Sequence, residues 1–316
     1  MSFEYKSANA PAKRPDAGPW WPSRWGAEDE RGALNLIGQQ QALSAARRIK
    51  TGDVVEMGFP FESGKPDFHH RDFHLASAGG PSGGPVGSGK FMYNDEVIAG
   101  NITGMSTHFN ALVHVGQQLG NVGDNNTVHY YNGHSHAEIG GPWGFRKLGV
   151  EKVDPIFTTG IVIDVAGLRG RPLDISEIIT RQDLLDALDR QGLDEGAIAP
   201  GSALFWRTGR GSYYFTDREK YISGAPGIEP ATAEWLCDKD VVVVGADAVA
   251  MEPVPPISDA LTVVHATFLC RRGVYVIVNV NLEPLAKREA WQFAFSCTPI
   301  PFVGAQGSPS RPFAIV

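Results

Sequence analysis

The sequence predicts an α/β fold in a single domain, and two features of its second half carry that prediction. Continuous apolar runs alternate there with amphipathic helical patterns, which is the order produced when helices pack on a central sheet. The apolar runs lack the in-out alternation of half-exposed strands, so they are typical of strands buried on both faces. No stretch of the 316 residues has the composition of an interdomain linker.

The first half of the chain contains fewer regular patterns. Residues 1–26 are polar and rich in proline and tryptophan, so we expect an irregular arm across the surface or a neighbouring subunit, followed by one domain over residues 27–316. Residues 39–49 have a helical pattern, and a short strand, VVEMGFPF, follows Gly52. Residues 74–90, HLASAGGPSGGPVGSGK, contain so much glycine and proline that we expect a mobile loop.

The second half supplies the strands and helices of the predicted sheet. The helix in TRQDLLDALDRQG has capping-box spacing between Thr180 and Asp183, and Gly192 ends it. A second helix begins at Glu229-Pro230, where proline occupies a first-turn position that tolerates it. The expected strands are TGIVIDVAG (159–167), SALFWRTG (202–209), DVVVVGAD (240–247) and GVYVIVNV (273–280).

Composition and charge exclude several classes of protein. The net charge is −7 and acidic and basic residues are interspersed, whereas a nucleic-acid partner would require a basic face. The sequence has no run of about 18 apolar residues and no apolar signal region, so we expect a cytoplasmic protein with no membrane partner. The three cysteines, Cys237, Cys270 and Cys297, are odd in number and widely spaced, which disfavours a disulfide framework and a zinc knuckle.

One motif in the glycine-rich segment resembles a phosphate-binding loop. Gly84 and the pair Gly89-Lys90 match G-x-x-x-x-G-K. Such a loop needs a strand before it, a helix after it, and a hydroxyl residue after the lysine. Here Phe91 follows the lysine and no helical pattern begins, so we reject nucleotide binding.

The placement of the histidines points to a metal site or an acid-base site. Imidazole is both the commonest metal ligand and the side chain that titrates near neutral pH. Taken singly, His69, His70, His129, His134 and His136 are expected to be solvated surface residues. Eight of the nine histidines fall between residues 69 and 136, at 69, 70, 74, 108, 114, 129, 134 and 136, and the ninth is His265.

The stretch THFNALVH, residues 107–114, differs from the other histidine segments because it is apolar. If it is extended, His108, Asn110, Leu112 and His114 share one face, and the apolar residues between them face the core. A helix would turn the two histidines apart. The pattern therefore predicts two imidazoles and an amide in one cleft, although two hydrogen-bonded histidines near the core would give the same pattern.

At this point the sequence resembles the cyclase-like metal-dependent hydrolases, the family that includes bacterial kynurenine formamidase and isatin hydrolase. The resemblance covers nearly the whole chain, and the sequence is most similar to the longer members of the family. It rests on SRWGAEDERGALNLI, THFNALVH, HYYNG, DVVVVGAD, HATFLCRRGVYVIVNVNLEPLA and GAQGSPSRPFAIV. The resemblance implies a mixed central β-structure flanked by helices, of the swivelling β/β/α type, and a homodimer or higher homo-oligomer.

The family motif is H-x-G-T-H-x-D-x-P-x-H, followed much later by a histidine and a glutamate. Carried over by position, His108 and His265 match metal-binding histidines, and His114 matches the histidine that acts as base or proton shuttle. The other positions depart from the motif. Gly104 stands in place of the first histidine, Ser106 of the glycine, Asn110 of the aspartate, Leu112 of the proline, and Val278 of the late glutamate.

These departures leave the metal question open. The resemblance implies a divalent ion such as zinc or manganese, held by His108 and His265, but both carboxylate ligands are replaced by Asn110 and Val278. A catalytic zinc usually needs three protein ligands, and a neutral amide binds metal weakly. Residues that could substitute as ligands are Asp95, His69, His74, Asp124, Asp247 and Glu252.

Three functions follow from this sequence. The resemblance implies a hydrolase that directs water at the carbonyl of a small cyclic or aromatic amide, formamide or lactone, with His114 as proton shuttle. Alternatively, His108, His114 and His265 transfer protons without a metal, in an isomerase, a dehydratase or a lactone-opening or ring-closing enzyme. Asn110 then donates a hydrogen bond to a developing oxyanion. A ligand-binding protein without activity is the third. In each case the expected partner is a small molecule. Aromatic residues could line an apolar pocket for it, and the candidates are Trp20, Trp21, Trp25, Phe59, Phe61 and Phe91.

Overall fold

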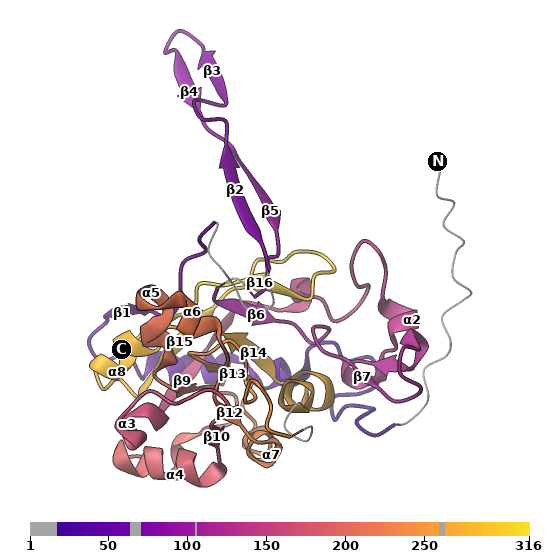
Figure 1. Cartoon of the computed structure of the whole chain (residues 1–316), viewed down its shortest axis with the longest axis vertical. Helices are drawn as coiled ribbons and strands as arrows, with labels where there is room; N and C mark the ends of the chain where they lie inside the picture. Colours follow the sequence, from indigo (N-terminus) through magenta and orange to yellow (C-terminus); the bar gives the residue numbers. More distant parts are fainter. Residues whose placement is uncertain (1–17, 64–70, 105, 259–262) are drawn as a thin grey trace.

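The computed structural model describes residues 18–63, 71–104, 106–258 and 263–316. Within these ranges, nine strands form one curled mixed sheet in the order β1-β17-β15-β9-β11-β13-β14-β6-β16 (Figure 1). Its strands are β1 (Val54–Glu56), β6 (His108–Asn110), β9 (Ile156–Asp164), β11 (Ala203–Arg207), β13 (Val243–Ala246), β14 (Tyr275–Val278), β15 (Gln292–Cys297), β16 (Gly307–Pro309) and β17 (Phe313–Ile315). The predicted α/β fold with a mixed central β-structure is confirmed.

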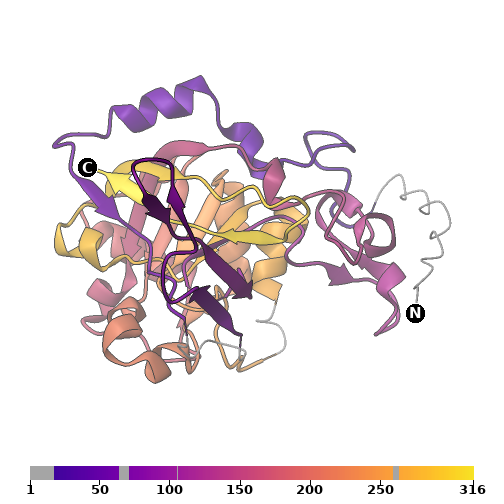
Figure 2. The same ribbon diagram turned by 90° about the horizontal axis from the view of Figure 1, so that it is seen from above.

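Helices pack along this sheet. Figure 2 shows α1, in indigo, along one side of the sheet; α1 contacts β9 and β15, and α4 also contacts β9. The helices are α1 (Gln39–Ala46), α2 (His136–Ile139), α3 (Val165–Arg169), α4 (Arg181–Arg190), α5 (Tyr213–Thr216), α6 (Arg218–Ile222), α7 (Pro230–Asp238), α8 (Glu283–Lys287) and the π-helix η9 (Ala266–Arg272). Two-residue strands outside the main sheet pair as β7 (Gln117–Gln118) with β8 (Val128–His129) and β10 (Ile178–Ile179) with β12 (Gly227–Ile228).

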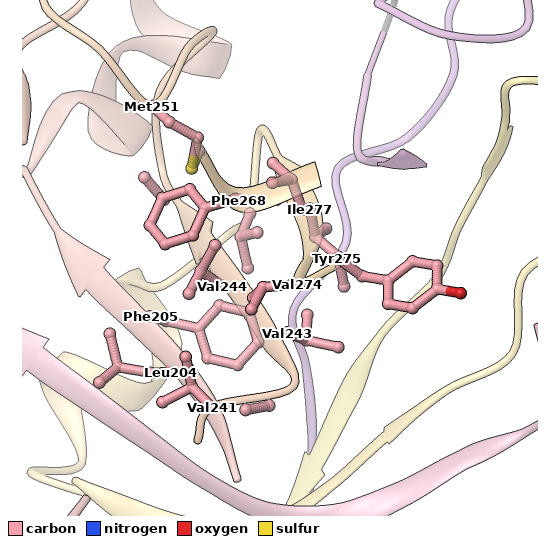
Figure 3. Packing of buried hydrophobic residues seen from close by; sticks show 14 of the residues in the cluster. Leu204, Phe205, Val241, Val243, Val244, Met251, Phe268, Val274, Tyr275 and Ile277 are labelled. Carbon is pink, nitrogen blue, oxygen red and sulfur yellow. The ribbon is translucent and has the colours of Figure 1, made fainter. Parts of the chain in front are cut away.

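The four apolar runs of the second half form the parallel centre of the sheet. β9, β11, β13 and β14 pair parallel to one another in that order. Every residue of β13 and β14 is buried, as expected for strands covered on both faces. Figure 3 shows how Phe205 of β11, Val244 of β13 and Phe268 of η9 pack together in this core.

The helix signals in the sequence are confirmed with small changes at the ends. The Thr180 hydroxyl accepts a hydrogen bond from the Asp183 N–H, and the Asp183 carboxylate accepts one from the Thr180 N–H, which completes the capping box of α4. Helix α7 begins at Pro230 as predicted. Helix α1 ends at Ala46, three residues before the predicted end, because residues 47 and 48 already form a turn.

The expectation of a mobile loop over residues 74–90 is wrong. This segment and the residues after it form two antiparallel ladders, β2 (Phe73–Ser77) with β5 (Glu96–Gly100) and β3 (Gly83–Val86) with β4 (Phe91–Tyr93). Together they project from the body of the molecule (Figure 1). Glycine permits this pairing, because a Cβ on Gly83 would lie 2.2 Å from the Tyr93 ring.

The rejected phosphate-loop motif lies in the same hairpin. Gly89 and Lys90 belong to the turn between β3 and β4, and the chain continues as a strand at Phe91. A phosphate loop would place a helix after the lysine, so the structure supports the rejection.

The described part of the N-terminal arm is irregular and lies on its own chain. It contains two isolated bridges, Gly18 to Trp21 and Ser23 to Gly26. The Trp20 indole N–H donates to the Tyr130 carbonyl, and the Ser23 N–H donates to the Asn132 side chain. Contact of this arm with a neighbouring subunit stays a prediction.

The strand predicted as VVEMGFPF is shorter than expected, because β1 pairs with β17 only over Val54 to Glu56. Cys237, Cys270 and Cys297 are free and buried, so they form no disulfides. Among the helices of the described ranges, none is both long and apolar enough to cross a membrane.

Candidate active site

Strand β6 carries two of the predicted site residues, His108 and Asn110. It lies between β14 and β16 and pairs antiparallel with both. Because side chains alternate along a strand, His108 and Asn110 line a cavity while Phe109 packs on the other face, 5.2 Å from the Tyr275 ring. The predicted convergence of an imidazole and an amide is therefore present.

His114 reaches the same cavity from a turn instead of from the strand. The pairing of β6 with β14 and β16 ends at Asn110, and the last backbone hydrogen bond to the neighbouring chain runs from the Ala111 N–H to the Gln306 carbonyl. The chain then turns, and the His114 N–H donates to the Ala111 carbonyl at 2.9 Å. The predicted extended segment through residue 114 is thus wrong beyond Asn110. Leu112, expected on the same face, is fully buried in the hydrophobic core.

The cavity has a volume of about 410 Å³, which suits a small molecule. Its apolar wall is aliphatic, and none of the aromatic residues proposed as a wall contributes to it. Trp21 stacks on His129, Phe59 stacks on Tyr214, and Phe91 is exposed in the hairpin. The lining residues are Arg71, Gly104, His108, Asn110, His114, Val115, Val249, Ala250, Glu252, Pro253, Val254, Pro256, His265 and Val278.

His108 and His114 are both held in the neutral form. The His108 Nδ1 lies 2.8 Å from the Ser106 carbonyl and 3.2 Å from the Gly104 backbone nitrogen, and both contacts hold the ring in place. Burial lowers the pKa of His108 to about 3. Burial, followed by the charge of the neighbouring His265, lowers the pKa of His114 to about 4, and its Nδ1 lies 3.3 Å from the Gln306 amide oxygen.

The pKa of His265 is shifted in the opposite direction, because this histidine is paired with a carboxylate. It immediately precedes the π-helix η9, and its Nδ1 lies 2.5 Å from Glu252 Oε2. Burial alone would lower its pKa, but the charge and the hydrogen bond of Glu252 together outweigh burial and raise it. The same pairing lowers the pKa of Glu252 in spite of burial. The rings of His265 and His114 are 6.5 Å apart.

Asn110 presents an unused acceptor to the cavity. The residue is 1% exposed, and its Oδ1 makes no hydrogen bond within the described part of the chain. A buried polar atom without a partner is costly, so such an atom in a cavity points to a ligand that completes it.

Arg71 adds a positive charge to the same cavity. Its guanidinium donates to the Thr103 carbonyl at 3.3 Å, and among the described residues it has no carboxylate partner. Gly104 makes room for it, since a Cβ at that position would lie 1.8 Å from Arg71 Nη1. No local pattern points to Arg71, because its place in the cavity depends on its spatial proximity to Gly104 and His108.

Five of the six residues considered as substitute ligands lie in the described ranges, and of these Glu252 is the one that lines the cavity. His74 and Asp95 are exposed in the hairpin, and Asp124 caps the short helix at residues 125–127. Asp247 is buried elsewhere, on the backbone of Thr208 and Gly209. His69, with its neighbour His70, lies outside the described residues.

The remaining histidines are not the solvated residues that we expected. His134 is 1% exposed and lies 3.3 Å from Glu138, and His136 contacts the Tyr130 hydroxyl through Nδ1. His129 is partly buried against Trp21. These three support residues 129–138 and do not line the cavity.

Comparison with known proteins identifies the fold. A family model described as "Putative cyclase" matches residues 40–253, which is more than half of the chain. A crystal structure of a novel cyclase is 31% identical, with a TM-score of 0.79, over 93% of this chain and 98% of that one. The chain belongs to the cyclase family. The resemblance inferred from sequence is therefore confirmed.

More distant members of the fold include named hydrolases. Isatin hydrolase A from Ralstonia solanacearum is 20% identical with a TM-score of 0.55, covering 88% of this chain and 97% of that one. A protein from Bacillus stearothermophilus named as a "predicted metal-dependent hydrolase" is 17% identical with a TM-score of 0.50, covering 83% and 97%. These likenesses show the fold. No curated protein sequence matches the chain.

The donor set of this cyclase-family member does not fit the metal that the family implies. Val278 lies directly opposite His108 in the β14–β6 ladder, so the position of the late glutamate contributes an isopropyl group to the cavity. The first histidine position is Gly104, whose space the Arg71 guanidinium fills. Within the described ranges, no three His, Cys, Asp or Glu side chains are placed to share an ion. A neutral amide and a guanidinium do not replace carboxylate ligands.

Proposed function

We propose that the protein hydrolyses a small lactone or activated ester, with His114 as general base and His265 as general acid. The observation that carries this proposal is that His114 and His265 line one cavity with their ring centroids 6.5 Å apart, and that their surroundings shift their pKa values in opposite directions. The pKa of His114 is lowered and that of His265 is raised, so near neutral pH one can accept a proton while the other can donate one. The isatin hydrolases among the similar structures support hydrolysis as an activity that this fold can carry.

The chemistry follows from these two groups. His114 takes a proton from water as the water oxygen bonds to the carbonyl carbon, and the C=O electron pair moves onto the carbonyl oxygen. When that pair returns, the bond to the leaving oxygen breaks and His265 donates its Nε2 proton to that oxygen. A lactone gives a hydroxy acid and an ester gives an acid and an alcohol, and solvent restores the two protonation states. Glu252 positions His265 through Nδ1 and keeps its charged form stable.

The substrate class follows from the size and lining of the cavity. A volume of about 410 Å³ with aliphatic walls accommodates a small, mostly apolar ring. Acid-base catalysis by imidazole supplies roughly 10²–10⁴-fold, which suits lactones and activated esters better than an unactivated amide. We therefore expect lactones to react faster than formamides or cyclic imides.

A substrate panel tests this function directly. Purified protein is incubated with lactones, formamides and cyclic imides, and acid release is followed at constant pH. We expect hydrolysis of at least one lactone. If nothing is turned over while a compound of the panel still raises the melting temperature, the protein is a ligand-binding member of the family and the proposal fails.

Chelation separates this chemistry from the metal chemistry that the family implies. We expect the hydrolytic rate to be unchanged after dialysis against a chelator, because the proposed proton transfers use only His114 and His265. The measurement is activity together with metal content before and after dialysis. A rate that disappears on chelation and returns with zinc or manganese would contradict the proposal.

The pH profile is expected to depend on Glu252. Activity should rise as pH passes about 4, where His114 loses its proton, and fall at higher pH as His265 loses its own. Without the carboxylate, burial lowers the pKa of His265, so Glu252→Gln should move the alkaline limb to lower pH. The acid limb should move much less, because the charge of Glu252 is the smallest of the effects on the pKa of His114. The measurement is kcat/KM from pH 3.5 to 9.

The control for this profile is Glu219→Gln, which removes an exposed carboxylate outside the cavity. Its pH profile should match that of the unmodified protein. An alkaline limb that stays in place in Glu252→Gln would show that His265 is not the acid.

A further inference from the structure

We propose that Arg71 is a further catalytic residue, which binds the oxygen of the scissile carbonyl and stabilises its negative charge during hydrolysis. This inference rests on the proposed function. It names the group that stabilises the negative charge on the carbonyl oxygen, a role that neither His114 nor His265 performs. The oxygen in question is neutral in the substrate, an oxyanion in the tetrahedral intermediate and part of a carboxylate in the product. A fixed guanidinium interacts most strongly with the last two states.

The position of Arg71 supports this role. Its guanidinium lines the cavity together with His108, Asn110 and His114. It has five N–H donors, and among the described residues it uses one of them on the Thr103 carbonyl, so several remain for a ligand. Within the described ranges no carboxylate neutralises it, and Glu252, the carboxylate in this cavity, is already paired with His265.

Gly104 is the residue that admits the guanidinium. A Cβ there would lie 1.8 Å from Nη1, 2.5 Å from Cδ and 2.7 Å from Cζ of Arg71. A side chain at position 104 and the guanidinium in its present place therefore exclude each other. The backbone at Gly104 has φ +99°, which other residues rarely adopt, so the glycine both opens the space and permits the turn.

The charge balance of the cavity favours an anionic ligand group. His108 and His114 are neutral, and the charge of His265 is offset by Glu252. Arg71 therefore leaves a net positive charge in a largely aliphatic cavity, where electrostatic interactions are stronger than in water. Planar guanidinium groups bind carboxylates through two parallel hydrogen bonds, which matches the product of the reaction.

Binding of a product-like acid tests the inference without any need for turnover. The probes are benzoate and the neutral benzamide, titrated into the whole protein and followed by calorimetry. We expect Arg71→Met, which keeps most of the side-chain volume, to weaken benzoate binding about tenfold to a hundredfold and to leave benzamide binding unchanged. Arg71→Lys should recover part of the benzoate affinity, and Arg190→Met, which removes an exposed cation on α4, should change neither.

Each outcome has a separate meaning. Benzoate binding that is equal in Arg71→Met and the unmodified protein would overturn the inference, whatever the enzyme hydrolyses. Loss of both probes in Arg71→Met would show a structural role for Arg71 and would also overturn it. If a lactone substrate is found, kcat should fall about 10²–10³-fold in Arg71→Met with little change in KM. Failure of the substrate panel alone would remove the proposed function and leave the carboxylate site standing.

Discussion

Replacing His114 with alanine is expected to lower kcat/KM for lactone hydrolysis by about 10²–10⁴-fold, which is the usual contribution of one general base. His114 is the neutral imidazole that faces His265 across the cavity, with the two ring centroids 6.5 Å apart. The measurement is steady-state hydrolysis together with a melting curve, which checks that the variant is folded.

A matched control is His74→Ala, since His74 is exposed on the hairpin and does not line the cavity. This variant should retain full activity. Full activity in His114→Ala would show that the site has been placed wrongly. An equal loss in both variants would point to the hairpin and not to the cavity.

Replacing Asp247 with alanine is expected to cost about 3 kcal/mol or more of folding free energy, because several buried donors lose the acceptor that they share. The carboxylate is 0% exposed and accepts hydrogen bonds from Thr208 N, Thr208 Oγ1, Gly209 N and Gly211 N. Alanine would leave these donors buried without a partner. Denaturant unfolding measures the change.

The comparison variant is Asp189→Ala, at an exposed position of α4. Its free energy of unfolding should stay within about 0.5 kcal/mol of the unmodified value. A small effect in Asp247→Ala would mean that water replaces the carboxylate, and the buried hydrogen bonds would then not hold the turn after β11.

The sequence was sufficient for the central elements of the fold because their signals are local. The apolar runs of β9, β11, β13 and β14 are too long and too continuous for exposed strands, and the cap of α4 is made by residues three positions apart. The hairpin over residues 73–100 was missed because glycine normally disfavours strands. Within strand β3, the Tyr93 ring packs over Gly83 in the place that a side chain would take, which no local pattern reveals.

For the candidate site, the sequence by itself determined the family, the pairing of His108 with Asn110 on one strand face, and the loss of two carboxylate positions. These depend on residue identity and on the period of two along a strand. The tertiary structure alone decided that His114 arrives from a turn, that Glu252 pairs with His265, and that Arg71 fills the space above Gly104. Such contacts join residues from separate elements. The protonation of the histidines depends on burial and on neighbouring charges, so the reactivity of THFNALVH depends on residues that only the folded chain places beside it.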